Sequence, residues 1–266
     1  MSKPAEVGKF DTKDAVASME RMYKTPDICK QRAKMVELLS LKEGEAVLDV
    51  GCGAGFFLQD AAPLVGATGK LAGVDLAEPM VEAAKARMGD SCEVLVGGAD
   101  KLPFEDSTFD AIVYCQVLLY CPDVVKVLVE ARRVLKPGGR ILSVDTDMSE
   151  FTLYSSDPER VQRVLGRLKQ VVAHTTLPRQ MPMFIQQAGL KIQTADSVTL
   201  MSAGTASLES WAGFMVLDTF PRMVEGKPDP EHPTDGADFL AEQQKLSEAG
   251  HFFGSGNRFM FVSVPA

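Results

Sequence analysis

A short apolar run that ends in an acid and a glycine-rich turn most constrains how this chain can fold. Residues 44–55 read Gly-Glu-Ala-Val-Leu-Asp-Val-Gly-Cys-Gly-Ala-Gly, with Asp49 close to the end of the run. Such apolar, β-branched residues suit a strand buried on both faces, and the glycines let the backbone approach a ligand closely. Residues 56–65 read as a helix whose free N–H groups point back at the turn. The segment predicts a strand–turn–helix cradle for a small molecule.

A second acid indicates that this small molecule contains a nucleoside. Residues 69–75 form a second predicted strand ending at Asp75, about 20 residues beyond the glycines, where folds of this kind place a carboxylate on ribose hydroxyls. A dinucleotide site would use the same acid, but its loop requires Gly-x-Gly-x-x-Gly and holds a pyrophosphate. Here the sixth position is Phe56, and Asp49 would repel a phosphate. A ligand that carries an ammonium group fits the turn better.

Three further motifs follow in order over some 100 residues. Residues 97–104 read Gly-Gly-Ala-Asp-Lys-Leu-Pro-Phe, residues 110–114 are a short apolar run after an acid, and residues 134–142 read Val-Leu-Lys-Pro-Gly-Gly-Arg-Ile-Leu. Together with the glycine turn, this series resembles the class I S-adenosyl-L-methionine (SAM)-dependent methyltransferases, in particular small-molecule enzymes of the ubiquinone/menaquinone-methyltransferase-like type. The resemblance implies SAM as cofactor.

The resemblance also implies which residues hold the cofactor. Asp49 would lie near the SAM amino group, Asp75 on the ribose, and Gln116 beside the methionine portion or the acceptor. Many relatives have an acid that reaches the adenine amino group where this chain has Gly98, so Asp100 is expected to replace it. The full set of expected cofactor-binding residues is Asp49, Gly51, Gly53, Gly55, Asp75, Leu76, Met80, Ala99, Asp100 and Gln116.

Composition excludes several other classes of protein. The chain has 266 residues, 45% of them hydrophobic and 24% charged, and its net charge of −8 comes with no basic cluster that would neutralise a nucleic-acid backbone. No apolar stretch approaches the roughly 20 residues that span a bilayer, and the N-terminus lacks a secretory apolar region. The five cysteines form no Cys-x-x-Cys pair, which argues against a metal site and suits a reducing compartment. We expect a cytoplasmic monomer or homodimer without nucleic-acid partners or membrane insertion.

Alternation of helical and strand patterns predicts an α/β fold, a Rossmann-like doubly wound and mostly parallel seven-stranded sheet with an antiparallel last strand. The expected parallel strands lie near residues 46–50, 70–75, 92–96, 110–114 and 140–145, and the closing antiparallel pair near 190–200 and 258–264. The expected helices lie near residues 28–39, 56–65, 77–88, 123–135, 157–173 and 177–188.

We expect one methyltransferase domain over residues 1–266. It would comprise an N-terminal helical segment (1–43), a SAM-binding core (44–200 and 257–266) and a helical cap inserted before the last strand (201–256). The cap carries Trp211, Phe214 and Met215 at helical spacing, with a second helix near residues 237–248. In open α/β folds ligands bind at the carboxyl edge of the sheet, which a cap can cover, so these side chains either select the acceptor or fix the cap to the sheet.

Three residues are candidates for a catalytic role. Tyr23 precedes the helix that leads into the glycine turn, where its ring could attract a sulfonium, although a helix-end tyrosine also has a structural explanation. His174 could remove a proton from the acceptor, but a histidine at a helix C-terminus often serves the helix dipole. Tyr120 follows the fourth strand, and its apolar neighbours also suit a core position.

The sequence thus predicts an enzyme that transfers a methyl group from SAM to a small organic metabolite. The acceptor atom, whether oxygen, nitrogen, carbon or sulfur, stays open, because fold alone does not determine function. Two alternatives remain: a catalytically divergent protein that keeps the fold for binding, and an NAD-dependent oxidoreductase.

Overall fold

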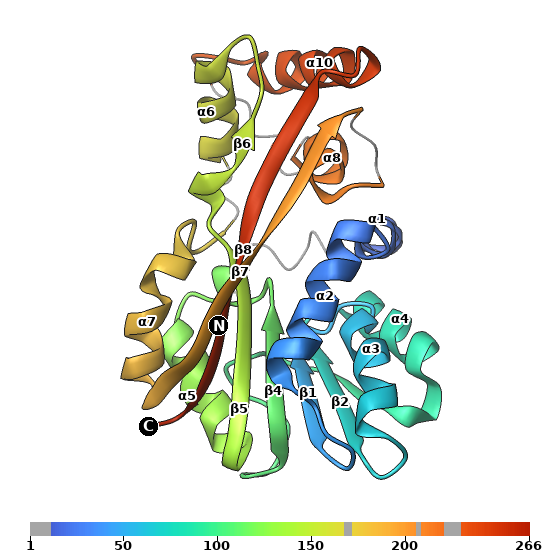
Figure 1. Cartoon of the computed structure of the whole chain (residues 1–266), viewed down its shortest axis with the longest axis vertical. Helices are drawn as coiled ribbons and strands as arrows, with labels where there is room; N and C mark the ends of the chain where they lie inside the picture. The colour runs from blue at the N-terminus through green and yellow to red at the C-terminus, as the bar shows by residue number, and fades with distance from the viewer. Residues whose placement is uncertain (1–11, 168–171, 206–208, 221–229) are drawn as a thin grey trace.

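The computed structural model describes residues 12–167, 172–205, 209–220 and 230–266. Helices and strands alternate along most of this chain (Figure 1). The helices are α1 (Lys13–Tyr23), α2 (Pro26–Leu39), α3 (Phe56–Val65), α4 (Glu78–Met88), α5 (Val124–Val134), α6 (Pro158–Arg167), α7 (Leu177–Gln187), α8 (Trp211–Phe214) and α10 (Asp235–Glu248). The strands are β1 (Ala46–Val50), β2 (Lys70–Asp75), β3 (Glu93–Val96), β4 (Phe109–Cys115), β5 (Leu135–Thr146), β6 (Thr152–Leu153), β7 (Leu190–Gly204) and β8 (Phe252–Pro265).

The strands form one sheet in the order β3-β2-β1-β4-β5-β8-β6, with β7 paired to β8. Strands β1 to β5 pair in parallel, whereas β8 is antiparallel to β5, β6 and β7. The doubly wound, mostly parallel sheet with an antiparallel last strand is therefore confirmed. An eighth strand, β6, was not expected, because a two-residue strand is too short to leave an alternating pattern in the sequence.

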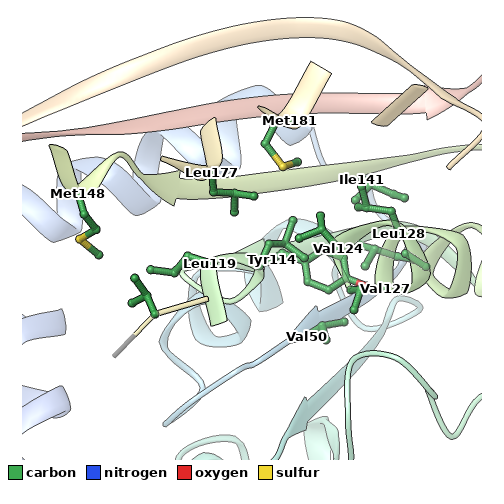
Figure 2. Close-up of a cluster of buried hydrophobic side chains, with 14 of the residues drawn as sticks. Val50, Tyr114, Leu119, Val124, Val127, Leu128, Ile141, Met148, Leu177 and Met181 are labelled. Carbon is green, nitrogen blue, oxygen red and sulfur yellow. The ribbon is translucent and has the colours of Figure 1, made fainter. Parts of the chain in front are cut away.

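Two apolar layers cover the sheet. On one face, α5 and α7 pack through Val124, Val127, Leu177 and Met181 against Tyr114 and neighbouring strand residues (Figure 2). On the other face, residues of α2, α3 and α4 pack against β1, β4 and β5. The central parallel strands are buried on both sides, as their continuous apolar runs predict.

The β7–β8 ladder is longer than the sequence predicts. It runs from the Leu190–Pro265 pair to the Gly204–Phe252 pair, so residues 201–204 and 252–256, expected within the cap, continue the strands. Strand β5 pairs with only the C-terminal half of β8, from the Ile141–Ser263 pair to the Thr146–Arg258 pair. The other half of the ladder extends beyond the carboxyl ends of the parallel strands, where α6, α8 and α10 gather around it (Figure 1).

Close packing joins the cap to this ladder. Trp211, at the start of α8, is 1% exposed, and its ring stacks on Phe151 with centroids 5.1 Å apart. A Cβ on Gly256 of β8 would lie 2.6 Å from the Trp211 ring, so only glycine leaves room for the indole on the strand. Of the two explanations for Trp211, the fold supports attachment of the cap.

Most helix boundaries agree with the predictions to within two residues, but the helix expected over 157–173 does not. The described part of this helix, α6, spans Pro158–Arg167, and residues 172–173 are not helical. Residues 168–171 lie outside the described residues. Of the expected cap, residues 206–208 and 221–229 also lie outside. Within the described ranges, no helix is both long and apolar enough to cross a bilayer.

Candidate functional site

The glycine turn lies between β1 and α3 and is held against the end of β2. The N–H groups of Gly51 and Cys52 both donate to the Val74 carbonyl, at 2.6 and 3.0 Å. The Asp75 carboxylate accepts the Gly53 N–H at 2.8 Å and the Ala77 N–H at 2.9 Å. Because ionised acceptors form the stronger hydrogen bonds, Asp75 fixes the shape of the turn as well as its position. The sequence analysis did not anticipate this supporting role.

Two glycines of the turn differ in what surrounds them. Gly51 and Gly53 both have positive φ angles, +72° and +49°. A Cβ on Gly51 would overlap the Val117 side chain, whereas a Cβ on Gly53 would meet no atom within 4 Å. The space beside Gly53 would let part of a cofactor lie directly against the backbone of the turn. The family resemblance would place the methionine portion of SAM there.

Gly55 serves helix packing instead. Its φ is +79°, and a Cβ there would lie 3.2 Å from the Ala84 Cβ of α4. This glycine therefore lets α3 start directly against α4, and its predicted place in the cofactor site is indirect.

Asp49 is an acid in an apolar setting. It is 3% exposed, and no hydrogen bond to its carboxyl group is found among the described residues. Burial, with the charge of Asp75 as a smaller cause, raises the pKa of Asp49 to about 8. A bound cation would reverse this tendency, because an ammonium group nearby favours the ionised carboxylate.

Tyr23 covers the start of α3 from the N-terminal segment. Its ring stacks on Phe56 with centroids 5.6 Å apart, and its hydroxyl lies in electrostatic range of Asp49, Cys115 and Arg258. Burial raises the pKa of Tyr23 well above its usual value, so the hydroxyl stays protonated at neutral pH. The structure thus brings Tyr23 to the glycine turn.

Arg32, from the same segment, holds this arrangement together. Its guanidinium donates to the Tyr23 carbonyl and forms an ion pair with Asp60 at 2.6 Å. This ion pair joins α2 to α3.

The residues expected around adenine follow the carboxyl ends of β2 and β3. Leu76 is 48% exposed, Met80 is buried, and Ala99 is half-buried. A Cβ on Gly98 would lie 3.0 Å from Asp100 Oδ1, so the carboxylate of Asp100 occupies space next to the position of the missing acid. Lys126 donates to Asp100 at 2.6 Å, and this bond lowers the pKa of the carboxyl group.

Gln116 directly follows β4 and hydrogen-bonds to β5. Its φ is +59°, an unusual value for a non-glycine residue, and its Nε2 donates to the Val144 carbonyl at 3.2 Å. Its Oε1 accepts a hydrogen bond from the Thr146 hydroxyl at 3.0 Å, and the same hydroxyl accepts one from Arg258. A hydrogen-bond chain therefore connects the ends of β4, β5 and β8.

His174 and Tyr120 lie at the turn that follows β4. His174 Nε2 lies 3.0 Å from the Cys121 carbonyl, so this nitrogen carries the proton and Nδ1 is the acceptor of the neutral ring. His174 is not at a helix end as expected, because α6 stops earlier, and its backbone N–H donates to the Leu119 carbonyl. Tyr120 is half-buried and packs against the apolar layer that includes Leu119.

Two buried charged residues at this edge were missed by the sequence analysis. Arg258 is 4% exposed and Asp145 is 2% exposed. Arg258 occupies the buried phase of β8, the phase also held by Phe252 and Met260. An arginine in the apolar phase of an alternating strand is a detectable signal, because charged residues are almost never fully buried without a purpose. Asp145 lies in a fully buried run and leaves no comparable pattern.

The described surface also has an open cavity of about 600 Å³ elsewhere, lined by Tyr154, Arg160, Glu242 and neighbours on α10. It lies between residues 154–160 and α10 and contains none of the predicted site residues. Among the described residues, no cluster of three or more His, Cys, Asp or Glu side chains could hold a metal ion.

We expect Gly51→Ala and Gly53→Ala to fail in different ways. Both place alanine at positive φ, which costs roughly 1–2 kcal/mol, but only Gly51→Ala adds a clash with Val117. Gly51→Ala should therefore lose more stability in urea unfolding. Gly53→Ala should stay close to that backbone cost and still lose affinity for S-adenosylhomocysteine in calorimetric titration. Full binding by Gly53→Ala would show that the open side of this glycine is not part of the cofactor site.

We expect Asp49→Asn to flatten the dependence of stability on pH. The native pKa is raised from 3.8 to about 8, so between these values the folded carboxyl group keeps a proton that the unfolded chain releases. Wild-type stability from this group is thus present at low pH and falls as pH rises, by up to about 1.4 kcal/mol per pH unit. Urea unfolding at several pH values in this window measures the slope, with Asp90→Asn, an exposed acid, as control. Equal slopes for wild type and Asp49→Asn would contradict the raised pKa.

Comparisons with known proteins agree with this geometry. Residues 48–143 match the family model described as a methyltransferase domain. The chain is 32% identical over 190 residues to an uncharacterized 37.1 kDa protein in a Streptomyces fradiae transposon, covering 70% of this chain and 55% of that protein. It is 36% identical over 149 residues to the demethylmenaquinone methyltransferase of Lactococcus lactis, covering 54% of this chain and 57% of the relative. The chain thus spans a little over half the length of these curated relatives.

A solved structure extends the match to most of the chain. The crystal structure of a SAM-dependent methyltransferase from Aquifex aeolicus superimposes with a TM-score of 0.52 at 26% identity, covering 73% of this chain and 92% of that protein. The residues matched by the family model, 48–143, include the glycine turn and its supporting acid, Asp75. Residues 48–143 therefore form a methyltransferase domain, and its fold is that of the class I SAM-dependent methyltransferases, a family of enzymes whose cofactor is S-adenosyl-L-methionine.

Proposed function

We propose that this protein transfers the methyl group of SAM to a small organic molecule. The observation that carries the proposal is the geometry of the glycine turn. Gly53 has free space where a Cβ would be, Asp75 accepts a hydrogen bond from its N–H, and Tyr23 lies near Asp49 beside the turn. This arrangement offers carboxylates and an aromatic face to a ligand that is positively charged at both its ammonium and its sulfonium group.

The proposed cofactor contacts follow from the family resemblance and the geometry. Asp49, Gly51 and Gly53 would hold the methionine portion, with Gly55 placing the helix behind them, and Asp75 would hold the ribose. Leu76, Met80, Ala99 and Asp100 would surround adenine. Gln116, anchored to β5, would face the methionine portion or the acceptor. The cofactor supplies an activated methyl group, and the chain supplies position and a dry environment.

Positioning is the main contribution required of this chain. Methyl transfer from a sulfonium is an in-line displacement that removes a positive charge, and alignment of two reactants can account for roughly 7–11 kcal/mol of a barrier. The N-terminal segment and the β7–β8 ladder would shield the reacting groups at the carboxyl edge from water. Tyr23 would contribute through its ring and not as a base, because its hydroxyl stays protonated.

An acceptor with an ionisable proton would also need a base. His174 Nδ1 is available for this role in the neutral ring, since Nε2 donates to Cys121. Tyr120, on the adjoining turn, would then help to position the acceptor. We propose both roles for the described geometry, with His174 as base and Tyr120 as contact.

Other parts of the proposal rest on composition and on the relatives. The name of the Lactococcus lactis relative gives demethylmenaquinone as its acceptor, which supports an organic ring compound as the acceptor here. The negative net charge argues against nucleic acid, and a monomer or homodimer needs no further partner. All five cysteines are free, which fits the reducing cytoplasm.

The experiment that tests the proposal is transfer of a deuterated methyl group. Purified protein, SAM with a trideuterated methyl group and a cell metabolite extract are incubated together, and mass spectrometry identifies species that gain the label. Binding of S-adenosylhomocysteine without label in any species would instead support a divergent binding protein. Binding of NAD in place of S-adenosylhomocysteine would support the oxidoreductase.

Asp75→Asn should weaken binding of S-adenosylhomocysteine at least tenfold. Loss of a charge-assisted acceptor costs about 1.5–3 kcal/mol, and an amide group also faces two N–H donors, those of Gly53 and Ala77, with one oxygen. Asp90→Asn is the matched control, because Asp90 is exposed beyond α4. Calorimetric titration measures both. An affinity within about threefold of wild type for Asp75→Asn would remove Asp75 from the ribose site.

Asp100→Asn should lower the same affinity about tenfold if Asp100 accepts from the adenine amino group, since an amino group without an acceptor costs about 1–3 kcal/mol. Lys126→Met separates this role from the ion pair, because it removes the partner and keeps the carboxylate. It should bind within about threefold of wild type. Equal binding by Asp100→Asn would mean that the adenine amino group is solvated or held elsewhere.

A further inference from the structure

Arg258 is a buried cation at the junction of the core and the cap. It lies on β8, opposite Thr146 of β5 and Val198 of β7, and is 4% exposed. It is the point at which β8 leaves β5 and continues into the cap. Arginine at such a position needs an explanation, because a desolvated charge is costly unless it is paired.

The described residues do not pair this charge. One terminal nitrogen of Arg258 donates to the Thr146 hydroxyl, and the guanidinium lies over the Trp211 ring at 5.0 Å from its centroid. Nε has no hydrogen-bond partner among the described residues, and no carboxylate of those residues lies within 4.0 Å of the guanidinium. Neutral contacts therefore surround a full positive charge.

Asp145 is in electrostatic range of Arg258 but does not neutralise its charge. Burial raises the pKa of the Asp145 carboxyl group to about 8. It is therefore mainly protonated at neutral pH. Asp145 Oδ2 has no partner among the described residues either, and the same holds for Trp211 Nε1. Arg258 Nε and the Nε1 of the Trp211 ring that faces the guanidinium thus both lack partners within the described ranges, which is the pattern of a site that a polar ligand completes.

The position of Arg258 places this site beside the cofactor residues and not among them. Strands β4 and β5 lie between β1 and β8, and neighbouring strands are about 4.8 Å apart, so Arg258 is roughly 14 Å across the sheet from the strand that carries Asp49. The chain from Gln116 through Thr146 to Arg258 spans the end of β5. Tyr23 is in electrostatic range of both Asp49 and Arg258.

We propose that Arg258 binds an anionic oxygen of the methyl acceptor, so that the acceptor is a small organic acid that is ionised at neutral pH, either a carboxylate or an acidic enol. This inference rests on the proposed function and deepens it by naming the substrate class. The planar guanidinium offers Nε and a terminal nitrogen side by side, a geometry that matches two oxygens of a carboxylate. Trp211 and Phe151 form an apolar wall that holds the guanidinium plane. Arg258 is a binding residue in this scheme, and the Thr146–Gln116 chain couples its position to the cofactor side.

The carboxylate of SAM is the other source of the same chemistry. The glycine turn and Asp49 lie at β1, and the separation across the sheet favours the acceptor as the occupant of the Arg258 site. Variants separate the two sources, because an acceptor contact changes the acceptor's KM and leaves cofactor affinity in place.

The first arm of the test determines the charge of the acceptor. The metabolite extract is divided by anion exchange at mildly alkaline pH into a retained, anionic fraction and an unretained fraction, and each is incubated with wild-type protein and trideuterated SAM. We expect labelled product only from the anionic fraction. Label only from the unretained fraction would overturn the assignment of Arg258 while the methyltransferase function stands. No label from either fraction would count against the proposed function and, with it, the acceptor assignment.

The second arm uses Arg258→Met, Arg258→Lys and the matched control Arg179→Met, whose guanidinium is half exposed and paired with Asp147. We expect Arg258→Met to raise the KM for the labelled acceptor at least tenfold, with S-adenosylhomocysteine affinity within threefold of wild type. Arg258→Lys should retain part of the acceptor affinity, and Arg179→Met should leave both values unchanged. A tenfold loss of S-adenosylhomocysteine affinity in folded Arg258→Met would assign the site to the cofactor. If Arg258→Met does not fold, Arg258→Lys and the fractionation still decide, because an unchanged KM in Arg258→Lys with label from the unretained fraction contradicts the proposal.

Discussion

Strand β8 hydrogen-bonds to β5 over residues 258–263 and to β7 along nearly its whole length, so one strand closes the core sheet and supports the cap. This pairing fixes where the cap stands relative to the parallel strands. Residues that lie far apart in the sequence meet at the point where β5 ends and β8 continues, among them Thr146, Trp211 and Arg258. Gly256 lies two residues before Arg258, on the same face of β8, and its lack of a side chain leaves the space that Trp211 fills.

Charge is distributed unevenly along the carboxyl edge of the sheet. At the β1–β2 end, Asp49 and Asp75 are close enough for the charge of one to raise the pKa of the other. At the β8 end, Arg258 carries a positive charge that is buried and not paired within the described residues. A cationic cofactor and an anionic acceptor would therefore find opposite charges at opposite ends of one edge. In the proposed reaction, this polarity would orient the two ligands before either makes specific contacts.

Helix and strand positions in the core follow closely from local pattern. The strand expected over residues 46–50 and the helix over 56–65 appear with those bounds, because the continuous apolar run and the glycine turn define both ends locally. Tyr23 stacks on Phe56 at the start of α3, next to the glycine turn, and its role toward a sulfonium stays a prediction. The length of the β7–β8 ladder was not predictable from pattern alone. Residues 191–195 of β7 are exposed one after another, so this part of the strand shows no alternation of burial from which its pairing could be read.

The sequence by itself determined the fold class, the cradle of Asp49 and the glycines, and the acid at Asp75, because each depends on residues within one strand–turn–helix unit. Only the tertiary structure decided that Asp75 holds the turn through two backbone N–H groups, and that His174 sits in a loop against Cys121. It also decided that Arg258 is buried beside Trp211 without a counter-ion among the described residues. Burial and pairing depend on contacts between different segments of the chain, such as those of Trp211 and Arg258, and no local pattern specifies those contacts.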